Sequence, residues 1–388
     1  MSSRIVVVGC GEFGVIAALS LARRGHQVCL IEGGGIPNSL AASTDISKIV
    51  RAAYGTDTLY LDLAARAREG WFEWNQRCRR DLKPELYQET GALMICRQPM
   101  SPESFEQACF DGVEALGHSP QRLNDSSLGD LYPAWAGTAF VDGFLDPRAG
   151  YAESAAAVWA AAEEARQRGV EILAGRPIER LLESHGRVTG VVEAAGEVHE
   201  ADGVLLAGGS WTSELAPELA ATLRRSYQPI WHLRPSEPDL FRADLFPVFT
   251  DGLEFPAFGG DNPAGGFYGF PLHPVHAVVK IGHHGAGVEP DPDRGLEVPA
   301  AETERLRSYL ARHLPALATA EIIHSRLCPY CMTPDENFLI ARHPERPGLT
   351  VATGGSGHAF KFMPVLGDII ADEVEGREHE LSARAGWR

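Results

Sequence analysis

The sequence predicts an α/β protein in which a Rossmann-like domain is interleaved with an α+β domain built on an antiparallel sheet. Three observations predict this class. A strand, a glycine-rich turn and a helix open the chain over residues 4–32. Glycine-rich strand ends recur near residues 208 and 354, as expected where several strand ends abut one ligand. Residues 227–298 alternate polar and apolar side chains, which is typical of an antiparallel sheet with one apolar face.

The first strand and helix carry a dinucleotide-binding fingerprint. Residues 5–8 are a short β-branched run, typical of a strand that is buried on both faces. Gly9, Gly11 and Gly14 then fit the pattern G-x-G-x-x-G. The first glycine permits the tight turn, the second lets a pyrophosphate approach the backbone, and the third lets the helix pack close to the strand.

A second strand at residues 28–31 ends in Glu32, 18 residues after Gly14. This is close to the position from which an acidic residue binds a ribose hydroxyl. A signal peptide is the rival interpretation of the N-terminus, because Arg4 precedes an apolar stretch. Glu12 and the glycines interrupt that stretch, and no small-residue cleavage site follows it, so the nucleotide fold is favoured.

Composition limits the classes of function. The net charge of −17 argues against nucleic acid or an anionic membrane as a partner, and no run approaches the roughly 18 apolar residues of a membrane span. The seven cysteines form no disulfide framework, which favours a reducing, cytoplasmic location. The single Cys-x-x-Cys pair lacks a second ligand pair, so no metal site is expected. Only four of the 35 basic residues are lysines, and each is therefore a candidate for a role that needs a compact ammonium.

The pattern of polar and apolar residues changes twice between residues 33 and 146. Residues 43–51 hold small hydroxyl residues followed by Lys48 and Arg51. This fits either a segment that lies along a cofactor or a helix N-cap with solvated cations. Residues 59–74 have the periodicity of an amphipathic helix. Residues 82–146 show short strand-like pieces, such as 91–96, and are typical of an inserted region.

Further elements follow in the order helix, strand, hairpin and buried strand, at residues 151–168, 169–173, 187–198 and 204–211. After the strand-rich residues 227–298, an amphipathic helix ends at Pro315. The chain closes with Cys-Pro-Tyr-Cys at 328–331, a strand at 349–352 and a helix from about Val365.

Five motifs accompany the N-terminal fingerprint: Lys-Ile-Val-Arg-Ala-Ala-Tyr-Gly at 48–55, Phe-Tyr-Gly-Phe-Pro at 267–271, Lys-Ile-Gly-His-His at 280–284, Cys328 with Asp335, and Gly-Ser-Gly-His-Ala-Phe-Lys-Phe at 355–362. In this order they resemble the monomeric sarcosine oxidase family of flavoproteins, which includes N-methyltryptophan, pipecolate and fructosyl amino acid (amadoriase) oxidases. The resemblance runs nearly end to end.

The resemblance implies FAD bound in an extended form, with an antiparallel sheet over the flavin and a covalent tether from the flavin 8α-methyl to Cys328. Family substrates are secondary amines, usually amino acids. Hydride leaves the carbon next to nitrogen for the flavin, the imine hydrolyses, and oxygen is reduced to peroxide. We expect a discontinuous FAD-binding domain (1–81, 147–216 and 320–388) and a substrate domain (82–146 and 217–319).

The family's motifs also imply roles for single residues. Arg51 and Lys361 match the pair that binds the substrate carboxylate, and Lys280 matches the lysine near the flavin where oxygen is activated. The other matched catalytic positions, on the substrate cavity or the flavin side, are His284, Tyr268, Tyr330 and Lys48. The expected cofactor-binding residues are Gly9, Gly11, Glu12, Phe13, Gly14, Glu32, Gly33, Ser43, Ser47, Lys48, Ile49, Ile178, Gly208, Trp211, Cys328, Gly355, Gly357, His358, Ala359, Phe360 and Lys361.

Departures from the family's pattern leave alternatives open. Lys48 stands where sarcosine oxidases have Arg, which is similar to the amadoriase branch, and Pro329 stands where they have Met. Cys-Pro-Tyr-Cys is also the sequence motif of a glutaredoxin active site. A redox-active dithiol and a structural cysteine are therefore alternatives to a flavin tether at Cys328. Pro334 disfavours the helix that a dithiol site needs. His358 fits either a satisfied buried histidine or a residue at the flavin edge, and Trp231 either the core or a wall of the substrate region.

The sequence therefore predicts an FAD-dependent oxidase of a small secondary α-amino acid, a CH–NH oxidoreductase that uses oxygen and acts as a monomer in the cytoplasm. The alternatives are an amine dehydrogenase with another electron acceptor and a deglycating fructosyl amino acid oxidase. A nicotinamide-dependent reductase would have one compact nucleotide domain at one end of the chain. Glycine-rich strand ends near residues 9, 208 and 354 do not fit that arrangement.

Overall fold

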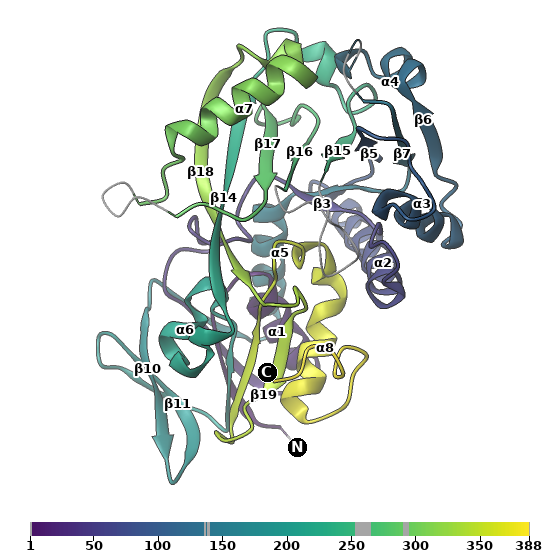
Figure 1. The fold of residues 1–388 in the computed structure, drawn as a ribbon. Helices are drawn as coiled ribbons and strands as arrows, with labels where there is room; N and C mark the ends of the chain where they lie inside the picture. Colours follow the sequence, from purple (N-terminus) through teal and green to yellow (C-terminus); the bar gives the residue numbers. More distant parts are fainter. Residues whose placement is uncertain (1, 136, 138–139, 253–264, 290–294, 388) are drawn as a thin grey trace.

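The structure is a computed structural model that describes residues 2–135, 137, 140–252, 265–289 and 295–387. Figure 1 shows two parts, one above the other, each organised around a large sheet. The expected strand-rich region 227–298 includes residues 253–264 and 290–294, which lie outside the described residues.

A six-stranded sheet forms the lower part in Figure 1, with the order β19-β20-β13-β1-β2-β9. All neighbouring strands are parallel except β19 and β20. The bounds are β1 (Arg4–Val8), β2 (Gln27–Glu32), β9 (Glu171–Ala174), β13 (Gly203–Leu206), β19 (Leu339–Arg342) and β20 (Leu349–Thr353). Helix α1 (Glu12–Arg23) crosses from β1 to β2 and packs against α5 (Ser154–Gln167) and α8 (Met363–Glu375).

An eight-stranded sheet forms the upper part, with the order β18-β14-β17-β16-β15-β5-β7-β6. Its neighbours are antiparallel except β15 and β5. The bounds are β5 (Ala92–Cys96), β6 (Gln121–Asn124), β7 (Asp142–Asp146), β14 (Arg224–Arg234), β15 (Val248–Asp251), β16 (Gly266–Gly269), β17 (Val279–His284) and β18 (Glu321–Met332). The long strands β14 and β18 run from this sheet toward the six-stranded one (Figure 1).

Alternation along the strands gives the eight-stranded sheet two different faces. Trp231, Val279 and Ile281 lie in an apolar core that includes residues of α7 (Ala300–His313). Because successive side chains of a strand point to opposite faces, His232 and Lys280 lie on the other face. His232 of β14 and Lys280 of β17 are thereby placed together on the face away from α7.

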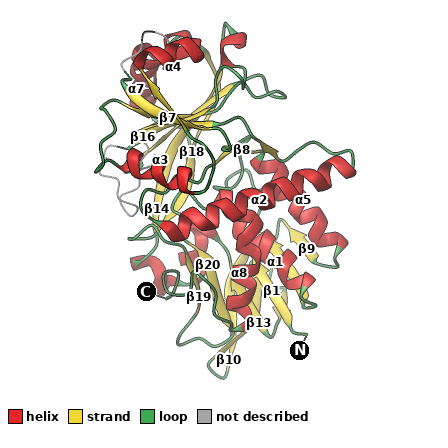
Figure 2. Cartoon of the chain, turned by 90° about the vertical axis from the view of Figure 1, so that its right-hand side faces the viewer, coloured by secondary structure: helices red, strands yellow, loops and turns green. Residues whose placement is uncertain are grey.

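Two small sheets and four further α-helices complete the described fold. The small sheets are β3 (Lys48–Val50), β8 (Gly150–Ala152) and β4 (Tyr87–Gln88), and β10 (Ile178–Ser184), β11 (Arg187–Glu193) and β12 (Val198–Glu200). The remaining helices of the described ranges are α2 (Thr58–Arg80), α3 (Phe105–Ala115), α4 (Asp125–Leu131) and α6 (Thr212–Leu215). Figure 2 shows α2 at the level between the two large sheets.

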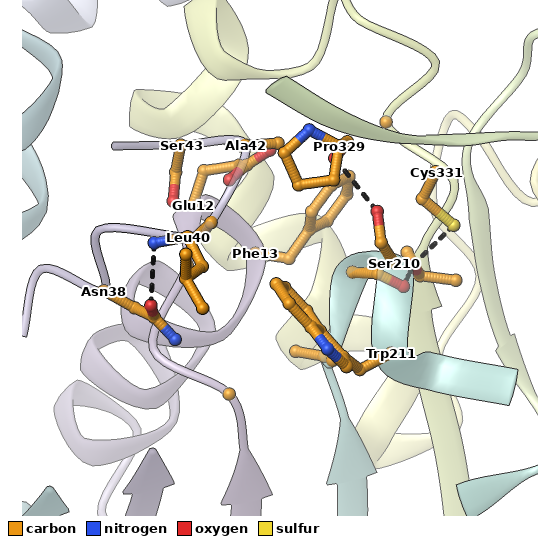
Figure 3. Close-up of a pocket in the computed structure, with 18 of the residues that line it drawn as sticks. Glu12, Phe13, Asn38, Leu40, Ala42, Ser43, Ser210, Trp211, Pro329 and Cys331 are labelled. Atoms are coloured by element: carbon orange, nitrogen blue, oxygen red, sulfur yellow. Dashed lines mark hydrogen bonds between the residues drawn. The ribbon is translucent and has the colours of Figure 1, made fainter. Parts of the chain in front are cut away.

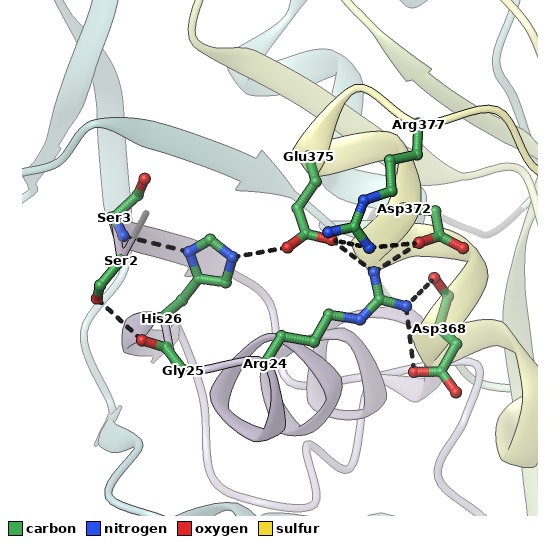
Figure 4. A network of polar contacts seen from close by, with 9 residues as sticks. All are labelled: Ser2, Ser3, Arg24, Gly25, His26, Asp368, Asp372, Glu375 and Arg377. Atoms are coloured by element: carbon green, nitrogen blue, oxygen red, sulfur yellow. Dashed lines mark hydrogen bonds and ion pairs between the residues drawn. The ribbon is translucent and has the colours of Figure 1, made fainter.

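A network of ion pairs fastens the last helix to the first one (Figure 4). Arg24, directly after α1, lies 2.6 Å from carboxylate oxygens of both Asp372 and Glu375 on α8. His26 Nε2 lies 3.1 Å from Glu375 Oε1. The C-terminal helix is therefore held beside the helix of the glycine fingerprint, and the 355–362 motif directly precedes it.

The predicted fold class is confirmed, with three local corrections. Helices α3 and α4 were missed, and α3 buries only the narrow stripe Phe105, Cys109 and Val113. The N-cap alternative for residues 43–51 is wrong, because residues 48–50 form β3 and pair with β8. The helix predicted from Tyr151 begins at Ser154, since residues 150–152 form β8. The domain boundaries stay a prediction; within 320–388, β18 pairs with β14 in the eight-stranded sheet.

None of the helices in the described ranges is long and apolar enough to cross a membrane. The seven cysteines all belong to the described residues, and all are free thiols in buried positions.

Candidate functional site

A cavity of about 460 Å³ lies at the carboxyl ends of β1, β2 and β13. This is where open parallel sheets bind ligands. Figure 3 shows one segment of the chain on one side of the cavity, with Asn38, Leu40, Ala42 and Ser43, and two others on the other side, with Ser210, Trp211 and Cys331. Ser210 Oγ donates a hydrogen bond to the carbonyl oxygen of Pro329 at 2.9 Å, which joins the β13 side of the cavity to β18.

Most of the predicted cofactor-binding residues line this cavity: Gly9, Gly11, Glu12, Phe13, Glu32, Gly33, Ser43, Lys48, Ile178, Gly208, Trp211, Gly355, Gly357, His358, Ala359 and Phe360. The others, which are absent from its wall, are Gly14, Ser47, Ile49, Cys328 and Lys361.

Two of the three fingerprint glycines, Gly9 and Gly14, meet the steric demands that the sequence predicted. Gly9 has a φ of +101°, and a Cβ there would lie 2.5 Å from the carbonyl oxygen of Ala207. Gly11 is the N-cap of α1 and lines the cavity, so the unpaired N–H groups of the first turn lie at its edge. A Cβ at Gly14 would collide with the carbonyl oxygen of Gly9. Gly14 therefore contributes through helix packing, which explains why it is not on the wall.

Two kinds of polar group on the wall are suited to a nucleotide. Glu32 is held in place, because its Oε2 accepts from Cys10 N at 2.8 Å and its Oε1 accepts from Gly34 N and Asn38 Nδ2 at 2.9 Å. Within the described part of the chain, the buried hydroxyl of Ser43 has no hydrogen-bond partner. An unsatisfied buried hydroxyl is unfavourable, so a bound ligand is a natural partner for Ser43.

Beyond the cavity wall, a buried hydrogen-bond chain surrounds Lys361. Lys361 Nζ donates to Tyr54 Oη and to the carbonyl oxygen of His358, both at 2.8 Å. Tyr54 Oη lies 3.0 Å from His358 Nδ1, and His358 Nε2 lies 2.9 Å from the carbonyl oxygen of Glu336. Because a carbonyl only accepts, Nε2 of His358 carries the proton and Nδ1 accepts from Tyr54. His358 is thus a satisfied buried histidine that also lines the cavity.

Arg51 and Lys361 lie around the same aromatic ring. The Arg51 guanidinium is 5.6 Å and the Lys361 ammonium 5.2 Å from the ring centre of Tyr54. Both side chains are buried, and Arg51 also donates to the carbonyl oxygen of Ala53. Burial, followed by the charge of Arg51, lowers the pKa of Lys361 well below its usual value. Two cations brought together in a buried place favour an anionic ligand.

Neutral rings lie beside these cations. Burial and then the nearby His283, Arg51 and Lys361 lower the pKa of His284 to about 4, so its imidazole is neutral at pH 7. Burial raises the pKa of Tyr268 and of Tyr330. The rings of His284 and Tyr330 are 5.6 Å apart. Glycines make room for these rings, because a Cβ at Gly282 would strike Tyr268 and one at Gly357 would strike Tyr330.

Lys280 is paired with an acid that the sequence analysis did not single out. Its Nζ lies 2.7 Å from Asp45 Oδ2 and donates to the carbonyl oxygen of Ser47 at 2.5 Å. Asp45 Oδ1 also accepts from His232 Nε2 at 3.0 Å. Burial lowers the pKa of Lys280 to about 8, with Asp45 acting in the opposite direction.

Cys328 and Cys331 have different surroundings. Cys331 lines the cavity, and burial raises the pKa of its thiol. Cys328 Sγ lies 3.9 Å from Lys48 Nζ and 3.8 Å from the carbonyl oxygen of Ala42, behind two residues of the cavity wall. Cys328 is thus the sulfur that lies beside the ammonium of Lys48.

One group of possible metal ligands lies together in the described residues, consisting of Glu193, Glu197 and His199. Arg176 lies 3.1 Å from Glu193 and 2.9 Å from Glu197, and His199 lies 2.7 Å from Glu193. This arrangement is a compensated ion-pair network, and none of the four residues lines the cavity.

Comparisons with known proteins identify the family of this chain. Residues 4–373 match the DAO family, described as FAD dependent oxidoreductase. The chain belongs to this family. It is 27% identical over 383 residues to monomeric sarcosine oxidase of Bacillus sp. (strain B-0618), covering 97% of this chain and 94% of that one. It is 28% identical over 445 residues to L-saccharopine oxidase of Schizosaccharomyces pombe, covering 100% and 96%. The structure of Amadoriase I from Aspergillus fumigatus superposes with a TM-score of 0.80 at 25% identity, covering 100% of this chain and 90% of that chain.

The chemical groups on the cavity wall are suited to binding FAD. The N-terminus of α1 and the glycine turn would hold the pyrophosphate, and Glu32 would hold ribose hydroxyls. The unsatisfied hydroxyl of Ser43 would gain a partner. The 355–360 segment and Tyr330 line the wall on the side of the buried cations, where the reactive end of FAD is expected.

Three residues of the site had no assigned role in the sequence analysis: Asp45, His232 and Tyr54. Tyr54 follows Arg51 by three positions within a quoted motif, and that proximity was a usable signal. Asp45 and His232 carried no such signal, because their contacts with one another and with Lys280 join distant segments. Trp231 is fully buried in the core beside α7, and His283 packs on Phe267, so neither ring walls the substrate region.

Proposed function

We propose that this protein is an oxidase of a secondary α-amino acid, either N-methyl, cyclic or otherwise N-substituted, that reduces oxygen to hydrogen peroxide. The observation that carries this proposal is the pair of buried cations, Arg51 and Lys361, around Tyr54. Lys361 donates to the carbonyl oxygen of His358, which lines the FAD cavity. The relatives' names, sarcosine oxidase and saccharopine oxidase, support the same substrate class. We further propose that the protein acts as a monomer in the cytoplasm.

The substrate carboxylate would lie between the two cations. Arg51 supplies a planar fork that matches a carboxylate, and Lys361 supplies a point charge. The two acceptors of Lys361 are neutral, the hydroxyl of Tyr54 and the carbonyl of His358. A bound carboxylate would therefore compensate a charge that burial makes unfavourable.

The amine end of the substrate would lie among Tyr268, Tyr330 and His284. These rings are neutral at pH 7 and exclude water, and they therefore disfavour a charged ammonium. Loss of the proton frees the nitrogen lone pair, which is needed when hydride leaves the adjacent carbon. FAD, when bound, accepts that hydride and passes the electrons to oxygen. Lys280 would stabilise the negative charge that develops on oxygen.

A substrate panel tests this proposal. Oxygen-dependent peroxide release is expected from N-methyl amino acids, pipecolate, proline or fructosyl amino acids, with rates that rise with pH as the amine loses its proton. Matched amines without the carboxylate should be poor substrates. Fructosyl amino acids as the preferred group would select the deglycating alternative, which the likeness to Amadoriase I favours. Turnover with an artificial electron acceptor but without peroxide would select the dehydrogenase, and preference for an amine lacking any carboxylate would overturn the proposal.

We also propose that the flavin is tethered through Cys328, as a thioether between Sγ and the 8α-methyl carbon. Forming this bond would break the thiol S–H and one 8α C–H bond, with the two electrons going to the flavin and from it to oxygen. Yellow colour should then stay in the acid-precipitated protein. Cys328→Ser should lose or release the flavin, because Cys328 is the sulfur beside an ammonium. Cys331→Ser is the matched control, since Cys331 is also buried and lies only three residues away. Flavin in the acid supernatant of the intact protein would contradict the tether.

A further inference from the structure

The ammonium of Lys280 is enclosed by protein on several sides. The side chains of Lys280 and Asp45 are only 1% and 3% exposed, and their charged atoms are 2.7 Å apart. The carbonyl oxygen of Ser47 accepts from the same ammonium, and the ring of Phe270 lies 4.7 Å away. A buried ammonium is stable in its charged form only where an anion or several acceptors compensate it.

Asp45 is in turn fixed by its own loop, by β14 and by the start of α5. Its Oδ1 accepts from Ile46 N at 2.7 Å and from His232 Nε2 at 3.0 Å. Its carbonyl oxygen accepts from Ser154 Oγ at 2.6 Å and Ala155 N at 3.0 Å, at the start of α5. The carboxylate therefore cannot turn away from Lys280 without breaking contacts to β14.

The sheet register explains why His232 reaches the same carboxylate. His232 on β14 is directly opposite Lys280 on β17, so both side chains project from the same face. His324 is opposite His232 on the edge strand β18, with the two rings 5.1 Å apart. A row of titratable side chains thus leads from the buried lysine to the exposed edge of the sheet.

We propose that Asp45, held by His232, is the positioning residue that keeps the Lys280 ammonium charged and in place. This rests on the proposed function, in which Lys280 acts on oxygen as a cation. Within the described residues, the other charged or titratable groups that interact with Lys280 are Lys48 and Cys328. Those that interact with Asp45 are Lys48, His232, His276, His324, Tyr268 and Tyr330. Lys48 opposes the charge on Lys280, so Asp45 is the carboxylate that offsets both burial and this repulsion.

The small number of lysines makes a direct test possible. In flavin-loaded protein labelled with ¹³C and ¹⁵N at lysine, NMR has four side-chain signals to follow, from Lys48, Lys83, Lys280 and Lys361. Lys280→Met and Lys83→Met variants assign two of them. In wild type we expect the Lys280 signal to titrate with a midpoint near pH 8. In Asp45→Asn the midpoint should fall by about one pH unit or more, because the paired anion is lost. The exposed Lys83 is the internal control and should not move.

A second measurement tests the pairing of Asp45 with Lys280 if Asp45→Asn is too unstable to titrate. The double variant Asp45→Asn with Lys280→Met removes both members of the buried pair, so neither is left without its partner, and it should be more stable than either single variant in urea unfolding. Additive losses in the double variant, or an unchanged Lys280 midpoint in Asp45→Asn, would overturn the inference. Neither readout depends on turnover. Absence of peroxide from the whole substrate panel would instead overturn the proposed function and leave these readouts intact.

Discussion

Replacing Lys280 with Met is expected to slow the reaction of the reduced enzyme with oxygen by on the order of 10²-fold or more. The substitution removes a buried, fixed cation while it keeps most of the aliphatic stem. Removing a preorganised charge from a site that excludes water costs several kcal/mol of transition-state stabilisation. Reduction of the flavin by substrate should change much less, because Arg51 and Lys361 bind the substrate in this proposal. Stopped-flow measurement of the two half-reactions separates these effects.

The pH dependence of the oxygen reaction provides a second readout on the same residue. Burial lowers the pKa of Lys280 to about 8, so the ammonium is present below that pH and is lost as pH rises through it. Reoxidation should accordingly slow above about pH 8 in wild type and show little dependence there in Lys280→Met. Lys83→Met, at an exposed lysine, is the matched control. Equal slowing of both half-reactions in Lys280→Met would contradict the role of Lys280 in the reaction with oxygen.

Replacing Arg51 with Ala is expected to raise KM for a carboxylate substrate by on the order of 10²-fold, with a smaller loss in kcat. Arg51 is 6% exposed, so its bond to a carboxylate would be screened little by water. Its contribution is expected to be similar in the ground and transition states, and such uniform binding appears in KM. Arg51→Lys should fall between wild type and Arg51→Ala, because it keeps the charge and loses the planar fork.

The matched control for Arg51 is Arg234→Ala, an exposed arginine paired with Glu321 at the end of β14. Its KM should equal that of wild type. A poor substrate that lacks the carboxylate should be affected little by Arg51→Ala. An equal rise in KM for substrates with and without a carboxylate would show that Arg51 acts on the shape of the site and not on the anion.

The sequence by itself determined those features of the protein that depend on a residue and its near neighbours in the chain. Gly9, Gly11 and Gly14 allowed the nucleotide fold to be predicted from their spacing, and the structure shows that Gly9 and Gly14 have no room for a Cβ atom. The strand-rich stretch after residue 227 predicted an antiparallel sheet by its alternation, and Arg51, Lys280 and Lys361 were singled out by rare lysines and by motif order. The narrow buried stripe of α3 was too weak a signal to be recognised as a helix.

Only the tertiary structure decided which charged side chains pair with one another. Asp45 lies in a segment of small polar residues, and its pairing with Lys280 depends on β17 and β14 bringing Lys280 and His232 side by side beneath it. Tyr54 likewise acquires its role when α8 carries the 355–362 motif against the chain that follows β3. Ion pairs and hydrogen bonds between distant segments leave no periodicity in the sequence, because their geometry is set by strand register and helix packing and not by neighbouring residues.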